Sequence, residues 1–282
     1  MKKNNWLEDY RLNVRSQHGE DGIIEKIMEI IPNKNKWCLE FGAWDGKLLS
    51  NTWNLINNHN WNAVLIECEA DRLNQLKQYY QSNPRVIAIN KFIHFEGNDT
   101  LDNILASTNI PIDFDFMSID IDGNDYHIWE SLMNYKPKLV AVEFNPTIPN
   151  DILFIQERDF DIFQGSSLAA FVQLAKNKGY ELISTTLNNA FFIDKQYYSF
   201  MDISDNSIFY LRKYSPEVES RVFTLYDGTV VWAGNKEHTQ TGYKIPIKRI
   251  QFLPRIIRKY IGKKRKPFLI KVFYLVHRAL FK

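Results

Sequence analysis

The sequence has few cysteines, which limits how the chain can be stabilised. Its 282 residues contain only Cys38 and Cys68, each in or beside an apolar run that predicts a buried strand. A disulfide framework is therefore not expected, and a buried thiol is more often inert packing than a nucleophile. No secretory signal pattern precedes the first predicted helix, and together with the two thiols this predicts a cytoplasmic protein.

Acidic residues are absent from the C-terminal part of the chain. The last one is Glu237, and 13 Lys and Arg residues follow it, whereas residues 1–237 carry 22 basic and 33 acidic side chains. The overall net charge of +2 therefore hides an acidic body of net charge −11 and a basic tail. This asymmetry is typical of a tail that binds an anionic partner.

Long apolar runs are also absent, although the tail is amphipathic. Its segment 268–281 would span about 21 Å as a helix, less than the roughly 30 Å hydrocarbon core of a bilayer. We expect the tail to lie on an anionic membrane surface and not to cross it. The residues that favour this are the basic run Lys263–Lys266 and one apolar helical face, formed by Leu253, Ile256, Ile257, Tyr260 and Ile261.

The tail has two other candidate partners. The tail can pack on the acidic body of its own or a neighbouring subunit, which leaves a homo-oligomer open. No nucleic acid is expected, because the basic residues alternate with bulky aliphatic side chains and not with exposed stacking aromatics. The membrane surface is the partner that the pattern favours.

The most informative motif in the body is an apolar run, Trp37–Phe41, that leads into Gly42 and Gly46 and carries the acidic residue Glu40. A strand that enters a glycine-rich turn lets the backbone approach a ligand closely, because glycine has no Cβ. The spacing matches neither the dinucleotide fingerprint nor the phosphate-binding loop, so NAD and ATP are not favoured. An acidic group in the turn repels a pyrophosphate and suits a cationic ligand.

Four further apolar runs predict strands, and polar side chains follow each of them. The run 62–67 ends in Glu67, about twenty residues after the first turn, where Rossmann-like sheets place the acid that binds the ribose hydroxyls. The run 85–90 ends in Asn90, and we expect the residues after it to border the adenine. The remaining two runs, 114–120 and 138–143, end in Asp120 and Glu143, and Asp122 and Asn145 follow two residues later.

Helical and hairpin patterns connect these strands. Apolar residues between Ile23 and Ile31 predict an amphipathic helix before the first strand, and a second helix runs from Leu168, capped by Ser166 and Ser167 and closed by Gly179. Residues 180–185 and 190–193 predict an antiparallel hairpin, and residues 226–229 a second one with a type I′ turn. We divide the chain into a core at 1–194, an accessory segment at 195–245 and the basic tail at 246–282.

Six motifs, taken together, resemble the FkbM-type methyltransferases, a family of class I S-adenosylmethionine-dependent enzymes. The resemblance extends from about Ser16 to Ile193. At the second acidic residue of the fourth-strand motif, this chain has Asp122 where the family often has Glu. The motifs are Ser16–Gly22, Glu40–Gly46, Leu49–Thr52, Ile66–Glu67, Ser118–Gly123 and Val142–Pro146.

The resemblance implies a fold, a cofactor and a reaction. The fold is an α/β Rossmann-like sheet with the strand order 3-2-1-4-5-7-6, and the reaction is O-methylation of a sugar hydroxyl in a surface glycan or its lipid-linked precursor. The acceptor is then a glycan or glycolipid, met at the inner face of a membrane. The residues that the resemblance places near S-adenosylmethionine are Gln17, Glu40, Gly42, Gly46, Ser50, Asn51, Glu67 and Asp120. Asn90 is added to them because it ends the third predicted strand.

Methyl transfer to a hydroxyl needs a base that accepts the hydroxyl proton. Asp120 and Asp122 are candidates because they follow a strand at the reactive edge, and His127 is a third because its pKa lies near neutrality. Asp122, Glu143 and Asn145 also offer hard oxygen ligands that would suit Mg²⁺, which lowers the pKa of a bound hydroxyl. In the alternative interpretation, the two aspartates only cap the following helix.

Two rival functions were compared with methyl transfer. Asp120-x-Asp122 and Asp113-x-Asp115 resemble the D-x-D motif of metal-dependent nucleotide-sugar glycosyltransferases, but that chemistry gives the Glu40–Gly46 turn no role. A non-catalytic scaffold that docks on membranes through its tail is the other alternative. In the accessory region, aromatic side chains can stack on sugar rings or simply pack in a core; they are Tyr197, Tyr198, Phe200, Trp232 and the nearby Trp44.

Overall fold

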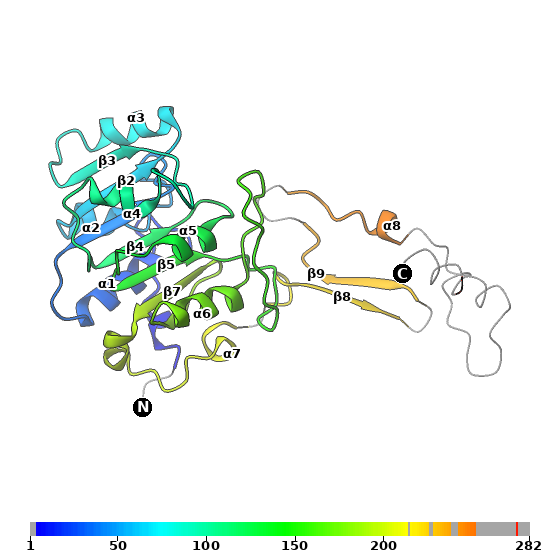
Figure 1. Ribbon diagram of the computed structural model, residues 1–282. Coiled ribbons are helices and arrows are strands. Elements are labelled where there is room, and N and C mark those ends of the chain that lie inside the picture. The colour runs from blue at the N-terminus through cyan, green and yellow to red at the C-terminus, as the bar shows by residue number, and fades with distance from the viewer. Residues whose placement is uncertain (1–3, 214, 226–227, 238–241, 252–274, 276–282) are drawn as a thin grey trace. The chain divides into compact units, whose positions relative to one another are not determined.

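The computed structural model describes residues 4–213, 215–225, 228–237, 242–251 and 275 (Figure 1). They fall into two compact units, each described by itself. The first holds the chain up to residue 215, and the second holds residues 216–237 and the chain from Gly242 onward. The predicted boundary after Asp194 therefore lies inside the first unit, which also contains residues 195–213.

A seven-stranded sheet forms the centre of the first unit, in the order β3-β2-β1-β4-β5-β7-β6. The first five strands run parallel, and β7 is antiparallel to both β5 and β6. This is the strand order expected for a class I methyltransferase, so that prediction is confirmed. The strands are β1 (Trp37–Phe41), β2 (Asn62–Glu67), β3 (Val86–Asn90), β4 (Phe116–Ile119), β5 (Leu139–Glu143), β6 (Tyr180–Thr185) and β7 (Asn189–Asp194).

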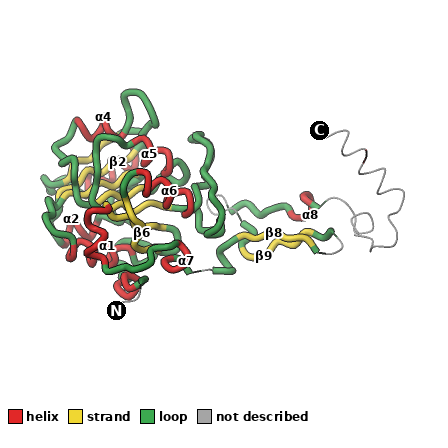
Figure 2. The backbone as a smooth tube through the Cα atoms, turned by 60° about the horizontal axis from the view of Figure 1, so that its bottom comes forward, coloured by secondary structure: helices red, strands yellow, loops and turns green. Residues whose placement is uncertain are grey.

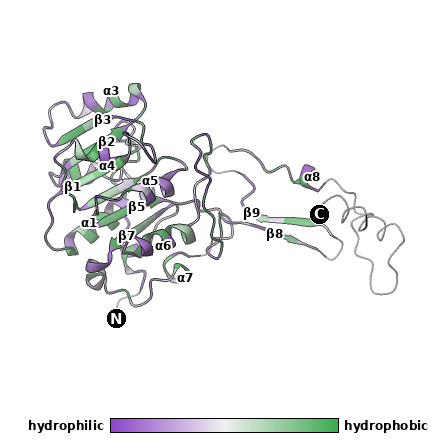
Figure 3. Cartoon of the chain, viewed as in Figure 1, coloured by the Kyte–Doolittle hydropathy of each residue, from purple (hydrophilic) through white to green (hydrophobic). Residues whose placement is uncertain are grey.

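Helices cover both faces of this sheet, and each face has its own apolar cluster (Figure 2). Residues of α4 (Leu101–Ala106), α5 (Asp125–Ser131) and α6 (Leu168–Asn177) pack on one face. The opposite face is covered by the 3-10 helix η1 (Trp6–Tyr10), α1 (Glu20–Ile30), α2 (Trp53–Asn58) and α3 (Ala70–Tyr79). The sheet is buried on both sides, which explains why its strands are nearly continuous apolar runs (Figure 3).

The two helices predicted from periodicity are present. In α1 the side chains of Ile23, Ile24 and Ile27 are buried, as their spacing on one helical face requires. In α6 the Ser167 side chain caps the helix by accepting a hydrogen bond from the backbone N–H of Ala170. Ser166, also predicted as a cap, instead accepts a hydrogen bond from the N–H of Gln156, so its hydroxyl fixes the loop before the helix.

A buried ion pair lies at the end of the sheet where β4 and β5 begin. The Lys138 ammonium lies 2.6 Å from the Asp115 carboxylate, and both side chains are almost fully buried. The other Asp115 oxygen accepts a hydrogen bond from the N–H of Lys36 at 2.6 Å. Because Asp115 precedes β4 while Asp120 follows it, the two D-x-D motifs lie at opposite ends of the strand.

The predicted β6–β7 hairpin is also confirmed, and the chain after it packs back on the core. The 3-10 helix η2 (Lys195–Met201) follows β7, and the Met201 carbonyl accepts a hydrogen bond from the Trp6 indole. Tyr197 and Tyr198 pack against the core cluster on this side, and the Tyr198 hydroxyl donates to the Ile203 carbonyl. Both tyrosines are half-buried, and their contacts are those of the core-packing alternative. The short helix α7 (Ile208–Leu211) completes the described part of this unit.

The second unit contains β8 (Ser220–Thr224) and β9 (Val230–Gly234), which pair antiparallel as predicted. Residues 226–227 lie outside the described residues, and the predicted turn type lies with them. In this unit the Trp232 indole donates to the Asn235 carbonyl. The helix α8 (Ile247–Ile250) is the main described piece of the basic tail. No helix in the described ranges is both long and apolar enough to cross a bilayer.

Candidate functional site

The turn after β1 brings the ends of β1 and β4 into close backbone contact. Gly42 has a φ of +72°, and a Cβ at this position would lie 1.8 Å from the carbonyl oxygen of Asp120. Only glycine fits there, since a side chain would overlap the backbone of β4. Gly46 has a φ of +73° and packs against the ring of Tyr80, whose hydroxyl donates to the Gly46 carbonyl. It supports the turn and does not line the pocket.

A pocket of about 520 Å³ opens at the carboxyl edge of the parallel strands, above this turn. This is the edge where open α/β sheets bind ligands, and the volume is that of a small-molecule site. Six of the nine residues predicted to contact the cofactor line the pocket, whereas Gly46, Asn51 and Asn90 do not. The six are Gln17, Glu40, Gly42, Ser50, Glu67 and Asp120.

Glu40 organises the loop that follows the turn. Its carboxylate accepts hydrogen bonds from the hydroxyls of Ser50 and Thr52, both at 2.6 Å, and from the N–H of Asn51 at 2.8 Å. Burial raises the pKa of Glu40, and these hydrogen bonds oppose that effect. The Asn51 amide turns away from the pocket and donates to the hydroxyl of Ser118 on β4. Glu40 therefore shapes the pocket floor through neighbouring residues as well as lining it.

Glu67 lies at the end of β2, where the ribose ligand was predicted. One carboxylate oxygen accepts a hydrogen bond from the N–H of Trp44, and the other accepts one from the N–H of Glu69, both at 2.8 Å. The side chain is buried yet lines the pocket. Because each oxygen has a second lone pair, the carboxylate is oriented and can still accept two hydroxyl groups.

The neighbouring strand β3 supports this position. The Asn90 amide donates to the carbonyls of Glu67 and Cys68, so Asn90 braces the end of β2 and does not face the pocket. Cys68 was expected to be buried, but it is exposed and lines the pocket, because it follows the last residue of β2. Cys38 is buried as expected. The pocket wall beyond β3 is instead formed by Lys91, Phe92 and Ile93.

Three carboxylates meet on the other side of the pocket. Single oxygens of Asp120, Asp122 and Glu143 all lie within 4.8 Å of one another. Burial raises the pKa of Asp120 well above its usual range, and the Glu143 charge adds to the effect. Burial, together with the charge of Asp125, raises the pKa of Glu143 to about 8. Such crowding is unfavourable unless a proton or a cation compensates it.

This carboxylate cluster differs from the ligand set predicted from sequence. Asp120 takes the place that was assigned to Asn145, whose amide donates to the Gln164 carbonyl and whose oxygen accepts from Thr147. Asn145 thus holds the loop after β5. Sequence reasoning also missed Asn188, which lines the pocket and donates to the Glu143 carboxylate at 2.9 Å. Its position in a hairpin turn gave no signal of such a role.

His127, the third predicted base, lies outside the pocket. One ring nitrogen is 2.7 Å from the Gln156 carbonyl, and the other is within 3.7 Å of the Glu130 carboxylate and near Arg158. The helix α5 turns this side chain away because its first residues stay at the sheet edge while His127 lies half a turn further on. The candidates left at the pocket for a base are Asp120 and Asp122.

Aromatic side chains form part of the pocket wall that sequence reasoning only partly identified. Trp44, named as a stacking residue, lines the pocket with the Arg72 guanidinium 4.0 Å from its ring centre. Phe160 and Phe163, from the loop after β5, line it as well and were not predicted. Phe160 packs edge-on against Phe92, which ties this loop to the wall beyond β3.

The charge of the pocket decides which ligands it suits. Its lining holds the carboxylates of Glu40, Glu67, Glu69, Asp120, Asp122 and Glu143. The lysine of the lining, Lys91, is paired with Asp99 at 2.7 Å. A diphosphate would meet strong repulsion here, whereas a cationic ligand would be attracted.

The similarity of this chain to known proteins is found among solved structures and not among sequences. No protein-family model matches the sequence, and no curated protein sequence is significantly similar to it. Among solved structures, the N-terminal domain of EvdMO1, in the presence of SAH and D-fucose, is 12% identical with a TM-score of 0.40, and the match covers 62% of this chain and 80% of that one.

Two further solved structures have the same level of similarity. Magnesium protoporphyrin IX methyltransferase from Synechocystis PCC 6803, with bound SAM, is 9% identical with a TM-score of 0.37, covering 61% of this chain and 76% of that one. The CurJ carbon methyltransferase is 9% identical with a TM-score of 0.41, covering 62% and 52%. The chain has the class I methyltransferase fold on its own evidence of strand order and pairing. Function must therefore be argued from the pocket.

Proposed function

We propose that this protein is an S-adenosylmethionine-dependent O-methyltransferase. The observation that carries the proposal is the oriented Glu67 carboxylate, at the end of β2, in a pocket that the Asp120 carboxylate also lines. Two acidic groups from different strand ends suit a ligand that has vicinal hydroxyls and a positive charge. S-adenosylmethionine has both features.

The residues of the pocket would have different roles. Glu67 would bind both ribose hydroxyls, and Glu40 with Ser50 would shape the floor beneath the rest of the cofactor. The cofactor would supply a methyl group carried by a sulfonium. Asp120 and Asp122, at the end of β4, would accept the proton of the acceptor hydroxyl. The raised pKa of Asp120 makes it a stronger base than an exposed carboxylate.

The carboxylate cluster also has the donor set for a divalent cation such as Mg²⁺. Asp120, Asp122 and Glu143 offer three hard oxygens within 4.8 Å of one another. A cation there would orient the acceptor hydroxyl and lower its pKa. Glu143 would release its proton on binding, because its raised pKa keeps it largely protonated at neutral pH.

We further propose a sugar hydroxyl of a surface glycan, or of its lipid-linked precursor, as the acceptor. The exposed Trp44 and Phe163 at the pocket are the kind of side chains on which sugar rings stack. The basic tail would bring the protein to the inner face of a membrane, where a lipid-linked acceptor would be found. Most of this tail lies outside the described residues, so the sequence alone supports its role.

The glycosyltransferase alternative has less support. Asp115 of the Asp113-x-Asp115 motif is paired with buried Lys138, away from the pocket. The Asp120-x-Asp122 motif does line the pocket, but the surrounding carboxylates would repel a nucleotide diphosphate. No described feature favours a non-catalytic scaffold over an enzyme.

The ribose contact is tested by Glu67→Ala. We predict at least a tenfold loss of S-adenosylmethionine affinity in calorimetric titration, because a charge-assisted hydrogen bond contributes roughly 1.5 to 3 kcal/mol and two are lost. Asp45→Ala is the matched control, since Asp45 accepts two backbone hydrogen bonds in the same turn and does not line the pocket. Wild-type affinity for the Glu67 variant would remove this residue from the site.

The cation site is tested by melting the chelator-treated protein with and without Mg²⁺. We expect Mg²⁺ to raise the melting temperature of the wild type and to have little effect on Asp122→Asn, because one of three charged ligands is lost. Asp99→Asn, at an exposed acid outside the carboxylate cluster, should respond like the wild type. Identical curves with and without Mg²⁺ in the wild type would contradict the site, and the base role would then need no cation.

The membrane role of the tail is tested by deleting residues 267–282. The full chain should co-sediment with anionic vesicles, less so at high salt, because exposed charges are screened beyond a Debye length of about 8 Å at physiological ionic strength. The truncated protein should stay in the supernatant and keep its affinity for S-adenosylmethionine. Equal sedimentation of both forms, or unfolding of the truncated one, would mean that the tail packs on the protein itself.

A further inference from the structure

The loop of residues 13–19, which precedes α1, contributes Gln17 to the pocket lining. The side-chain amide of Gln17 makes no hydrogen bond within the described part of the chain. Ser16 and Gly19, on either side, are buried, while Gln17 itself is exposed. A polar side chain is thus presented to the pocket by a loop whose flanks are fixed.

Asp21, at the start of α1, fixes the backbone of this loop. One of its carboxylate oxygens accepts hydrogen bonds from three successive backbone N–H groups, those of Val14, Arg15 and Ser16, at 2.7 to 2.8 Å. The Ser16 hydroxyl accepts a hydrogen bond from the N–H of Asp21 in return. Three converging N–H groups form an anion-binding nest, and here a buried side chain of the same chain fills it.

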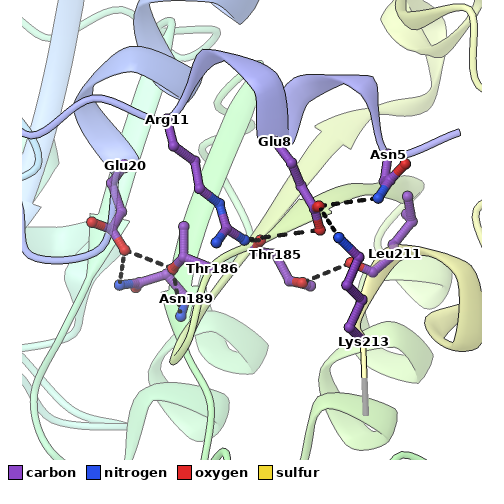
Figure 4. Close-up of polar contacts among 9 residues, drawn as sticks. All are labelled: Asn5, Glu8, Arg11, Glu20, Thr185, Thr186, Asn189, Leu211 and Lys213. Carbon is purple, nitrogen blue, oxygen red and sulfur yellow. Dashed lines mark hydrogen bonds and ion pairs between the residues drawn. The ribbon is translucent and has the colours of Figure 1, made fainter. Parts of the chain in front are cut away.

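Glu20 ties the same loop to the β6–β7 turn, and Figure 4 shows its contacts with Thr186 and Asn189. One carboxylate oxygen accepts a hydrogen bond from the N–H of His18 at 2.6 Å, and the other accepts one from the Thr186 hydroxyl at 2.6 Å. Thr186 belongs to the β6–β7 turn, which also carries Asn188, the partner of Glu143. One hairpin turn therefore braces both the loop and the carboxylate cluster.

We propose that Asp21 is a positioning residue for the cofactor pocket. It does not touch the pocket, but it holds residues 14–16 so that the Gln17 amide faces a polar group of the bound cofactor. The amide offers both a donor and an acceptor, so it can meet either a carboxylate or an ammonium group. The inference rests on the proposed function, since it assigns Gln17 to the S-adenosylmethionine site.

The test is a double-mutant cycle, with S-adenosylhomocysteine titrated calorimetrically into the full chain. Gln17→Ala should weaken binding about threefold to tenfold, the equivalent of one neutral hydrogen bond. Asp21→Asn should weaken it to a similar extent, because the neutral amide is a poorer acceptor for three N–H groups. Combined, the two changes should weaken binding no more than either alone, since Asp21 acts through Gln17.

Asp102→Asn is the matched control. Asp102 also accepts two backbone hydrogen bonds, from Met133 and Asn134, but it does not line the pocket, so its loss should lower stability and leave affinity unchanged. If Asp21→Asn does not fold, Ser16→Ala takes its place in the cycle, because it removes the hydroxyl that accepts the hydrogen bond from the N–H of Asp21. If the two changes reduce affinity independently, so that their effects multiply in the double variant, the inference is overturned and the proposed function stands. A loss of affinity in Asp102→Asn equal to that in Asp21→Asn would have the same consequence. Absence of binding by the wild type would overturn the proposed function and the inference with it.

Discussion

The close approach of two backbones at Gly42 is the constraint on which the pocket depends. With its carbonyl so near the first turn, Asp120 can only occupy its position if the residue at 42 has no Cβ. The same contact sets the distance between β1 and β4 at the carboxyl edge, where Glu40 and Asp120 line one pocket. A single glycine thus determines where the acidic groups of the two central strands lie.

A concentration of negative charge follows from that geometry. Six carboxylates line one pocket, and several of them are buried enough to have raised pKa values. Backbone and hydroxyl donors satisfy the carboxylates of Glu40 and Glu67. Among the described residues, Asp120 and Glu143 have no comparable set of donors, so a bound cation, organic or metallic, would stabilise their ionised forms. The pocket therefore suits a positively charged ligand, and this property comes from its carboxylate side chains and not from the fold.

Much of the fold could be predicted from the sequence because its signals are local. Five apolar runs of strand length and two amphipathic helices each bury a continuous face, and the structure contains all of them. The hairpin at residues 180–193 could be predicted equally well from its turn. The domain boundary after Asp194 could not be located from sequence, because η2 packs on β6 and on the distant helix α1. The exposure of Cys68 depends on where β2 ends, which is the least certain part of such a prediction.

The site was predictable to the extent that strand ends define it. Glu40 and Glu67 lie in the last residues of β1 and β2, Asp120 and Asp122 come just after β4, and all four line the pocket. Asn145 and His127 lie only a few residues further on, yet loop and helix geometry commits their side chains to other partners.

The most direct measurement of the central claim is the melting temperature in the presence of S-adenosylhomocysteine or of a nucleotide sugar with Mn²⁺. The account predicts a rise of several degrees with the first ligand and none with the second; the opposite result would contradict it.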